Sequence, residues 1–200
     1  MARGPTLAAD PRTSEAAMPL SKSSPRHHVH TREIRCYGYK RDDGLWDIEG
    51  SITDTKPYPV ENKDRDGINA GEPIHSMDIR LTIDDDMVIQ EAEATTNAAP
   101  FNVCDAITPT YAALKGLRVG AGWRRAIAER LGGVRGCTHI TDLLLGPLAV
   151  TAYQTLRAVR FKQYAERASG ERPPQLNSCH TFASDGAITK ERWPEFYSGD

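Results

Sequence analysis

The stretch Met77-Asp-Ile-Arg-Leu-Thr-Ile83 alternates apolar and polar side chains without a break. Strict alternation is the pattern of a β-strand with one buried and one solvated face. Such a strand belongs to an antiparallel sheet that is covered on one side only. The residues expected inside are Ile79, Leu81 and Ile83, and those expected outside are Arg80 and Thr82.

Hairpin signals lie on both sides of this strand. After it, Asp84-Asp85-Asp86 is a turn and residues 87 to 95 return as a strand. The three aspartates lack EF-hand spacing and its distal glutamate, so we favour a turn over a calcium site. Before it, residues 33–39 and 45–52 are rich in β-formers and flank the turn Asp42-Asp43-Gly44. Two hairpins predict a four-stranded antiparallel sheet.

Three helices are expected after the sheet. The first runs from an N-cap at Thr108 to a glycine stop at Gly116. The second covers residues 123–131, where large apolar side chains recur every four positions before a glycine pair. The third runs from 138 to 168, with a kink at Gly146-Pro147. Together these elements predict an α+β fold in which helices pack on one face of the sheet.

The chain divides into three parts. Residues 1–29 are rich in Ser, Pro, Arg and Ala and are expected to form a disordered arm that folding does not need. Its end, His27-His28-Val29-His30, could bind metal, but a solvated arm is the preferred interpretation. Residues 30–168 form the α+β domain. Residues 169–200 keep five large apolar side chains, so this tail is expected to pack back onto the domain.

Composition narrows the function. The net charge of −2 provides no basic field for nucleic acid or anionic lipid. No apolar run reaches the ~18 residues of a membrane span. The four cysteines form no CxxC pair, and the N-terminus lacks the apolar core of a secretory signal, so reduced thiols in a cytoplasm are expected. The expected partner is a small molecule, and a homo-oligomer is left open.

Candidate metal ligands lie at element ends, where side chains can converge without disturbing the core. His75 opens the central strand, Cys104 precedes the first helix, and Cys137 and His139 precede the third. Imidazole and thiolate suit zinc and also iron. The ordinary alternatives are a hydrogen-bonded surface histidine and a cysteine that acts as a small buried hydrophobe.

Charged residues gather near the first hairpin. Arg41 and Asp43 could bind a substrate carboxylate or phenolate. Asp54 could act as a base, with Lys56 and Tyr58 beside it as catalytic groups. The plain alternative, a turn and a solvated strand end, is preferred for this region.

The order of these elements resembles the NifU-like iron–sulfur scaffold proteins. The stretch Gly71-Glu-Pro-Ile-His-Ser-Met77, then Cys104, then Gly136-Cys-Thr-His139 follow in positions where that family carries its ligands. Here His75 replaces the first cysteine, and Met77 replaces the aspartate that follows it. The resemblance implies a NifU-like fold with a mixed His/Cys site, which favours one metal ion over a cluster.

A closer resemblance covers nearly the whole domain. Arg41-Asp-Asp-Gly-Leu-Trp-Asp-Ile-Glu-Gly50 and Gly136-Cys-Thr-His-Ile140 look like a bacterial domain-of-unknown-function family. That resemblance supplies no activity. It suggests a role in the breakdown of aromatic compounds, so the expected substrate is a small molecule that could be aromatic.

Three functions remain open from the sequence. The first is a metal-dependent enzyme, with zinc expected before iron, acting as a lyase through Lewis-acid and acid–base chemistry. The sequence shows no nucleophile elbow or other hydrolase signature. The second is a metal or iron–sulfur carrier. The third is a non-catalytic binding module whose Cys and His side chains are structural.

Overall fold

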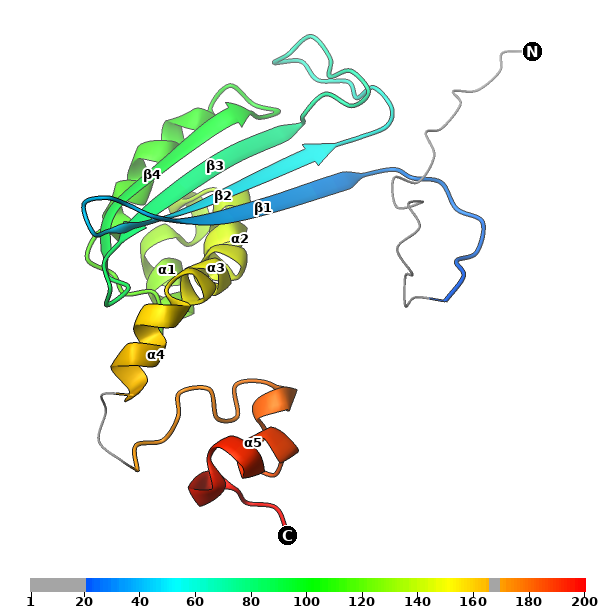
Figure 1. Ribbon diagram of the computed structural model, residues 1–200. Coiled ribbons are helices and arrows are strands. Elements are labelled where there is room, and N and C mark those ends of the chain that lie inside the picture. Colours follow the sequence, from blue (N-terminus) through cyan, green and yellow to red (C-terminus); the bar gives the residue numbers. More distant parts are fainter. Residues whose placement is uncertain (1–20, 166–169) are drawn as a thin grey trace. The chain divides into compact units, whose positions relative to one another are not determined.

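Four antiparallel strands form one sheet in the order β1-β2-β3-β4 (Figure 1). The structure, a computed structural model, describes residues 21–165 and 170–200. The four-stranded antiparallel sheet is therefore confirmed, whereas most of the expected disordered arm and the expected end of the third helix lie outside the described residues. The strands are β1 (Thr31–Lys40), β2 (Trp46–Thr55), β3 (His75–Ile83) and β4 (Ile89–Ala98).

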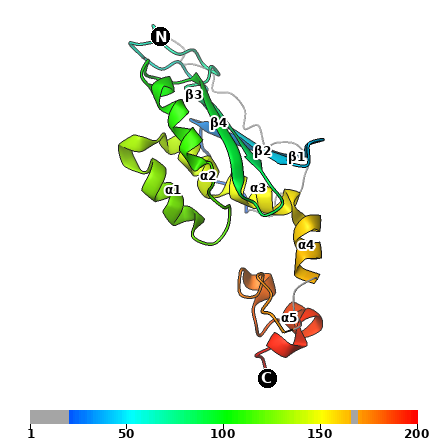
Figure 2. The ribbon, with the colours of Figure 1, turned by 90° about the vertical axis from the view of Figure 1, so that its left-hand side faces the viewer.

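Helices follow the sheet and cover one of its faces. Helices α1 to α3 lie on the same side of the sheet (Figure 1 and Figure 2). Helix α2 contacts β2 and β3, α3 contacts β1 and β2, and the 3-10 helix η1 contacts β4. The helices of this part are η1 (Cys104–Leu114), α1 (Trp123–Leu131), η2 (Gly133–Arg135), α2 (Thr138–Leu145) and α3 (Pro147–Thr155). The α+β class is confirmed.

The core lies between the sheet and these helices. In β3 the exposed fractions of Ile79, Leu81 and Ile83 are 2%, 1% and 0%, as the alternation predicts. The helices contribute buried leucine and isoleucine side chains, and α1 buries the apolar residues spaced four apart. Further core side chains are Ile48, Ile52, Met77, Ile89, Tyr111, Leu114, Trp123, Ile127, Leu131, Ile140, Leu143, Leu144 and Leu148.

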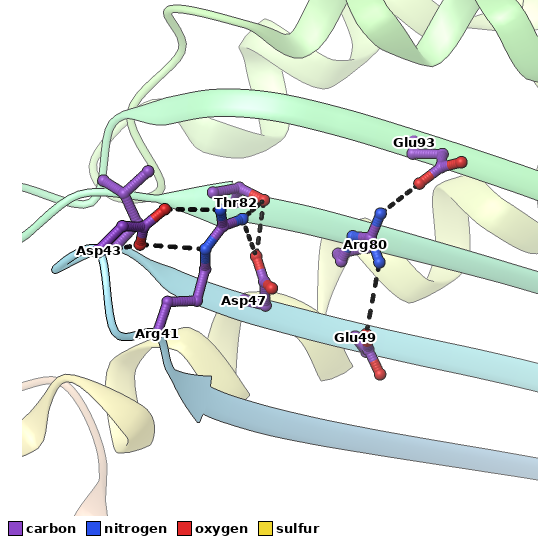
Figure 3. Close-up of polar contacts among 8 residues, drawn as sticks. Arg41, Asp43, Asp47, Glu49, Arg80, Thr82 and Glu93 are labelled. Carbon is purple, nitrogen blue, oxygen red and sulfur yellow. Dashed lines mark hydrogen bonds and ion pairs between the residues drawn. The ribbon is translucent and has the colours of Figure 1, made fainter.

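Thr82 departs from the predicted pattern, because it is only 3% exposed although it lies on the solvent side of β3. Its hydroxyl donates to the Asp47 carboxylate at 2.6 Å, and the Arg41 guanidinium donates to the same hydroxyl at 3.5 Å (Figure 3). These side chains cover Thr82. The alternation correctly gives the face on which a side chain lies, but burial on that face depends on neighbours from other strands.

The first predicted helix begins earlier and is tighter than expected. Its residues form the 3-10 helix η1, and Thr108 lies inside it instead of capping it. Pro109 has no N–H to donate. The hydroxyls of Thr108 and Thr110 donate back to the carbonyls of Asp105 and Ile107, which competes with α-helical bonding. The predicted end is close, since Gly116 follows with a φ of +80°.

The third predicted helix is three shorter ones. It breaks at Gly146, where a kink is expected, and again after Thr155. The hydroxyls of Thr151 and Thr155 donate to carbonyls four residues back, at 2.9 and 2.8 Å, a pattern that bends helices. Helix α4 (Arg157–Ala165) begins two residues after Thr155.

The rest of the chain, Leu156–Asp200, is a separate compact unit. Beyond α4 it contains η3 (His180–Phe182), α5 (Ala187–Arg192) and η4 (Pro194–Phe196). Its aromatic side chains contact one another, with the Phe182 and Trp193 rings 5.8 Å apart. Packing of the tail onto the sheet domain stays a prediction. No helix of the described residues is long and apolar enough to cross a membrane.

The contact between β1 and α3 supplies a test of the packing. A Cβ added at Gly38 would lie 1.8 Å from Oγ1 and 2.7 Å from Cβ of Thr155. We expect Gly38→Ala to lower the free energy of unfolding by about 1–3 kcal/mol, because the helix must move away from the strand. Equilibrium urea unfolding measures this change.

Thr155→Ala provides the matched control, since it removes the nearest atom. The double variant Gly38→Ala/Thr155→Ala should recover part of the loss relative to the sum of the two single variants. Additive losses, or a Gly38→Ala protein as stable as the wild type, would contradict this packing.

Candidate metal centre

The strand register places three functional side chains in one row across the sheet. Arg32 of β1 lies opposite Asp54 of β2, and Asp54 lies opposite His75 of β3. Directly opposed residues of antiparallel strands project to the same face. Asp54 alternates with Ile52, and His75 with Met77, so this face is the one that the helices cover.

Helix α2 brings a second imidazole to the end of this row. The N-cap of α2 is Cys137 in an extended conformation, which places His139 in the first turn. The buried Tyr111 hydroxyl fixes this start, because it accepts the Cys137 N–H at 2.8 Å and donates to the Cys137 carbonyl at 3.2 Å. The His75 and His139 ring centroids are 3.9 Å apart.

Asp54 is the hub of the cluster, with only 2% of its side chain exposed. Arg32 donates through Nε to Oδ1 and through Nη2 to Oδ2, both at 2.8 Å. His30 Nε2 lies 3.2 Å from Oδ1. His75 Nδ1 and His139 Nε2 lie 3.2 and 3.4 Å from Oδ2. One buried carboxylate therefore has four partners, from two strands, the segment before β1, and α2.

These contacts fix the charge states. Burial pushes the pKa of Asp54 up, but the pKa still lies below its usual value, and the hydrogen bonds and charge of the Arg32 guanidinium are the largest opposing cause. Burial lowers the pKa of His75, and the adjacent His139 lowers it further. Burial also lowers the pKa of His139. Near neutral pH the cluster thus combines an ionised carboxylate with two neutral imidazoles.

Asp54, His75 and His139 each offer one donor atom, and these atoms lie within 4.8 Å of one another. Ligands of a tetrahedral zinc ion at ~2.0–2.1 Å stand roughly 3.4 Å apart. The 3.2 and 3.4 Å separations from Asp54 Oδ2 match this spacing. The same separations are those of direct contacts between the carboxylate and the two imidazoles, so the geometry fits a metal centre and also a polar cluster without an ion.

All four expected ligands line one pocket, and two of them, His75 and His139, belong to the group of three donor atoms. Cys137 Sγ lies 3.7 Å from Nδ1 of His139, the ring nitrogen on the other side from Asp54, and is not one of the three grouped donors. Cys104 lines the adjacent pocket but also lies outside that group. The third grouped donor is the carboxylate of Asp54 in place of a cysteine thiolate. Cys137 is placed to hold the orientation of the His139 ring, as outer partners of metal-bound histidines do.

Asp54 was expected to be a base, and its environment argues for another role. A general base works best with a pKa near the working pH, whereas the pKa of Asp54 lies below its usual value. Lys56 and Tyr58, expected beside it, contact each other, with Lys56 Nζ 5.3 Å from the Tyr58 ring centroid. Lys56 also donates to the Val29 carbonyl at 3.3 Å.

The expected substrate-binding pair, Arg41 and Asp43, lies at the other end of the sheet. Arg41 donates to Asp43 through Nε at 3.1 Å and Nη2 at 2.6 Å, and to Asp47 at 3.3 Å (Figure 3). Asp47 and Asp54 stand at opposite ends of β2, roughly 23 Å apart at the rise of an extended strand. The structure therefore does not join this pair to the histidines, and its guanidinium is already paired.

Two members of the cluster were not predicted at this site: Arg32 was not singled out, and His30 was considered only within the His27-His28-Val29-His30 cluster, for which a solvated arm was preferred. The sequence carried a usable signal for Arg32. A hairpin turn centred on Asp43 places Arg32 eleven residues before the centre and Asp54 eleven residues after it, which is the observed pairing. His30 had no comparable hairpin signal, because residues 21–30, the described segment before β1, form no hairpin that fixes its position.

A pocket of about 470 Å³ opens beside the cluster, and His75, His139, Cys104 and Cys137 all contribute to its wall. A second depression, of about 340 Å³, lies on the other face of the sheet around Tyr37 and Arg80. There Arg80 pairs with Glu49 and Glu93 (Figure 3). Only the first pocket adjoins the grouped histidine donors.

Comparison with known proteins gives one match. The model of a family described as protein of unknown function (DUF2889) matches residues 30–154, which is more than half of the chain and spans the sheet and helices α1 and α2. The expected relationship to a domain-of-unknown-function family is thereby confirmed. No curated protein matches the chain. No solved structure matches it either.

The histidine pKa values predict how the metal-free protein responds to pH. Both folded-state pKa values lie below the ordinary value of about 6.5. Below that pH the unfolded chain binds more protons than the folded chain, so stability must fall as the pH is lowered. In a chelator, the free energy of unfolding should decrease from pH 7.5 to pH 5.5, as measured by urea titration at each pH.

The variant His75→Gln/His139→Gln should show a shallower decrease over this range. His180→Gln is the control, because it removes an exposed histidine of the second unit. Equal slopes for the double variant and the wild type would show that these two imidazoles are not held neutral.

Proposed function

The chain belongs to the DUF2889 family of proteins of unknown function, and from its site we propose that it is a metal-dependent enzyme. Asp54, His75 and His139 would hold one divalent ion. Zinc is the first choice and iron the alternative, because both accept two imidazoles and a carboxylate. The observation that carries the proposal is the set of three donor atoms within 4.8 Å of one another beside a pocket.

The electrostatics support this assignment. Metal ligands must be deprotonated at the binding atom, and the lowered pKa values keep both imidazoles neutral and the carboxylate ionised. Arg32 donates to both oxygens of the Asp54 carboxylate, so its positive charge would repel a metal ion bound to the same group. The guanidinium should therefore weaken metal affinity, and it would help to set the charge of the loaded site.

The chemistry proposed is that of a lyase acting on a small organic substrate, for which an aromatic compound was expected. When bound, the ion would supply Lewis-acid polarisation of a hydroxyl or carbonyl oxygen. His30 is the polar group of the segment before β1 that lies against this site. Its Nε2 lies 3.2 Å from Asp54 Oδ1, and 42% of its side chain is exposed. Lys56 instead contacts the Tyr58 ring and donates to the Val29 carbonyl.

A metal or iron–sulfur carrier is the second candidate, and the NifU-like relationship stays a proposal with it. One observation favours it: Cys104, Cys137, His75 and His139 line a single pocket. These are the positions at which the NifU resemblance expects ligands. Labile visible absorption that is lost in Cys104→Ser and Cys137→Ser would support the carrier. A chain that binds no metal would support the non-catalytic binding module.

Metal content tests the proposed enzyme directly. The purified full chain, loaded with zinc and freed of excess, should hold about one ion per chain by elemental analysis, as one three-donor site requires. Asp54→Asn, His75→Gln and His139→Gln should each lose it. Asp142→Asn is the matched control, because Asp142 lies 3.7 Å from Arg32 but is 61% exposed and outside the donor group.

Cobalt substitution then distinguishes the two ligand sets. With Asp54, His75 and His139 as ligands, the cobalt form should lack the intense near-ultraviolet band of thiolate ligation, and Cys137→Ser should keep its metal. A thiolate band that Cys137→Ser removes would instead favour the set containing Cys137. Metal retained in both Asp54→Asn and His139→Gln would contradict the centre proposed here.

A further inference from the structure

Three exposed apolar side chains surround one pocket. Phe101, Val103 and Val134 are 61%, 77% and 97% exposed, and all three line the pocket that His75 and His139 also line. Single exposed apolar residues are ordinary on protein surfaces, but their gathering around a concave site marks a binding surface. They come from two separate segments, the loop after β4 and the helix η2.

The pocket wall has an apolar part and a polar part. Met77, Pro100 and Ile107 continue the apolar rim inwards, and Thr138 stands with the two histidines. Among the described residues, no Asp, Glu, Lys or Arg lines this wall. A charged group held against the apolar part of the wall would lose its hydration without gaining an ionic partner. The wall therefore suits an uncharged body, and the histidines form its polar part.

We propose that this pocket binds an amphiphilic small molecule with an uncharged, ring-sized apolar body. The body would lie against Phe101, Val103 and Val134, and an oxygen-bearing head group would reach the ion held beside His75 and His139. Binding of the head group rests on the proposed function, whereas binding of the apolar body does not. The pocket volume of about 470 Å³ lies within the ~300–1,000 Å³ that small-molecule sites occupy.

Two metal-binding probes test the apolar body. Acetohydroxamate and benzohydroxamate share one head group and differ only in a methyl or a phenyl. On the zinc-loaded full chain, calorimetry should show benzohydroxamate binding about tenfold tighter or more, because its ring removes apolar surface from water. 4-Carboxybenzohydroxamate should lose that advantage, because its added charge finds no partner.

Substitutions at the exposed apolar residues of the pocket test where the phenyl ring of benzohydroxamate binds. Phe101→Ser and Val134→Ser should each reduce the preference for benzohydroxamate and leave acetohydroxamate affinity unchanged. Val150→Ser is the matched control, since Val150 is 59% exposed on α3 and does not line the pocket. Equal affinities of the two probes, or equal binding of the carboxylated one, would overturn the inference.

A metal-free measurement separates this inference from the proposed function. Saturation-transfer NMR with p-cresol on the chelated protein needs no ion, and its signal should fall in Val134→Ser but not in Val150→Ser. If the chain binds no metal but passes this test, the pocket inference stands and the proposed function fails. If p-cresol gives no signal, or if Val134→Ser changes only the oligomeric state in size-exclusion chromatography, the rim does not bind a small molecule.

Discussion

The carboxylate of Asp54 is almost fully buried, and a buried charge persists only where partners replace its lost water. Here the partners are a guanidinium in bidentate geometry and three imidazoles. They come from β1, β3, the segment before β1 and the first turn of α2. The strand register and the start of that helix must therefore both be correct before Asp54 can be buried at low cost. The cluster ties the sheet to its helical layer at one end.

The two ends of the sheet use polar side chains differently. At the hairpin end, Arg41, Asp47 and Thr82 pair with one another on the solvent face, which covers the threonine. At the other end, Asp54 and two histidines lie on the helix face beside a pocket. The first arrangement satisfies its own hydrogen bonds. The second keeps neutral imidazoles and an ionised carboxylate together, which is the state that a metal ion requires.

Much of this follows from local sequence. Alternation in residues 77–83 predicts the sheet and its buried face, and element ends predict that His75 and His139 converge. Asp54 was not predicted as a ligand. The connection between β2 and β3 is 19 residues long, so no short turn fixes the register that pairs Asp54 with His75. Burial of Thr82 and the bends in the third helix depend on side-chain hydrogen bonds that periodicity does not register. Sequence periodicity thus predicts where the strands and helices lie. Which candidate ligands lie close together depends on strand register and helix packing, which periodicity does not determine.

The central claim is that one ion can occupy the space between Asp54 Oδ2, His75 Nδ1 and His139 Nε2. Anomalous diffraction at the zinc edge, from crystals of the full chain grown with zinc, tests it most directly. The account predicts one strong peak ~2.0–2.2 Å from each of these three atoms. A peak bonded instead to Cys104 or Cys137, or three side chains that keep their direct contacts with no peak between them, would contradict it.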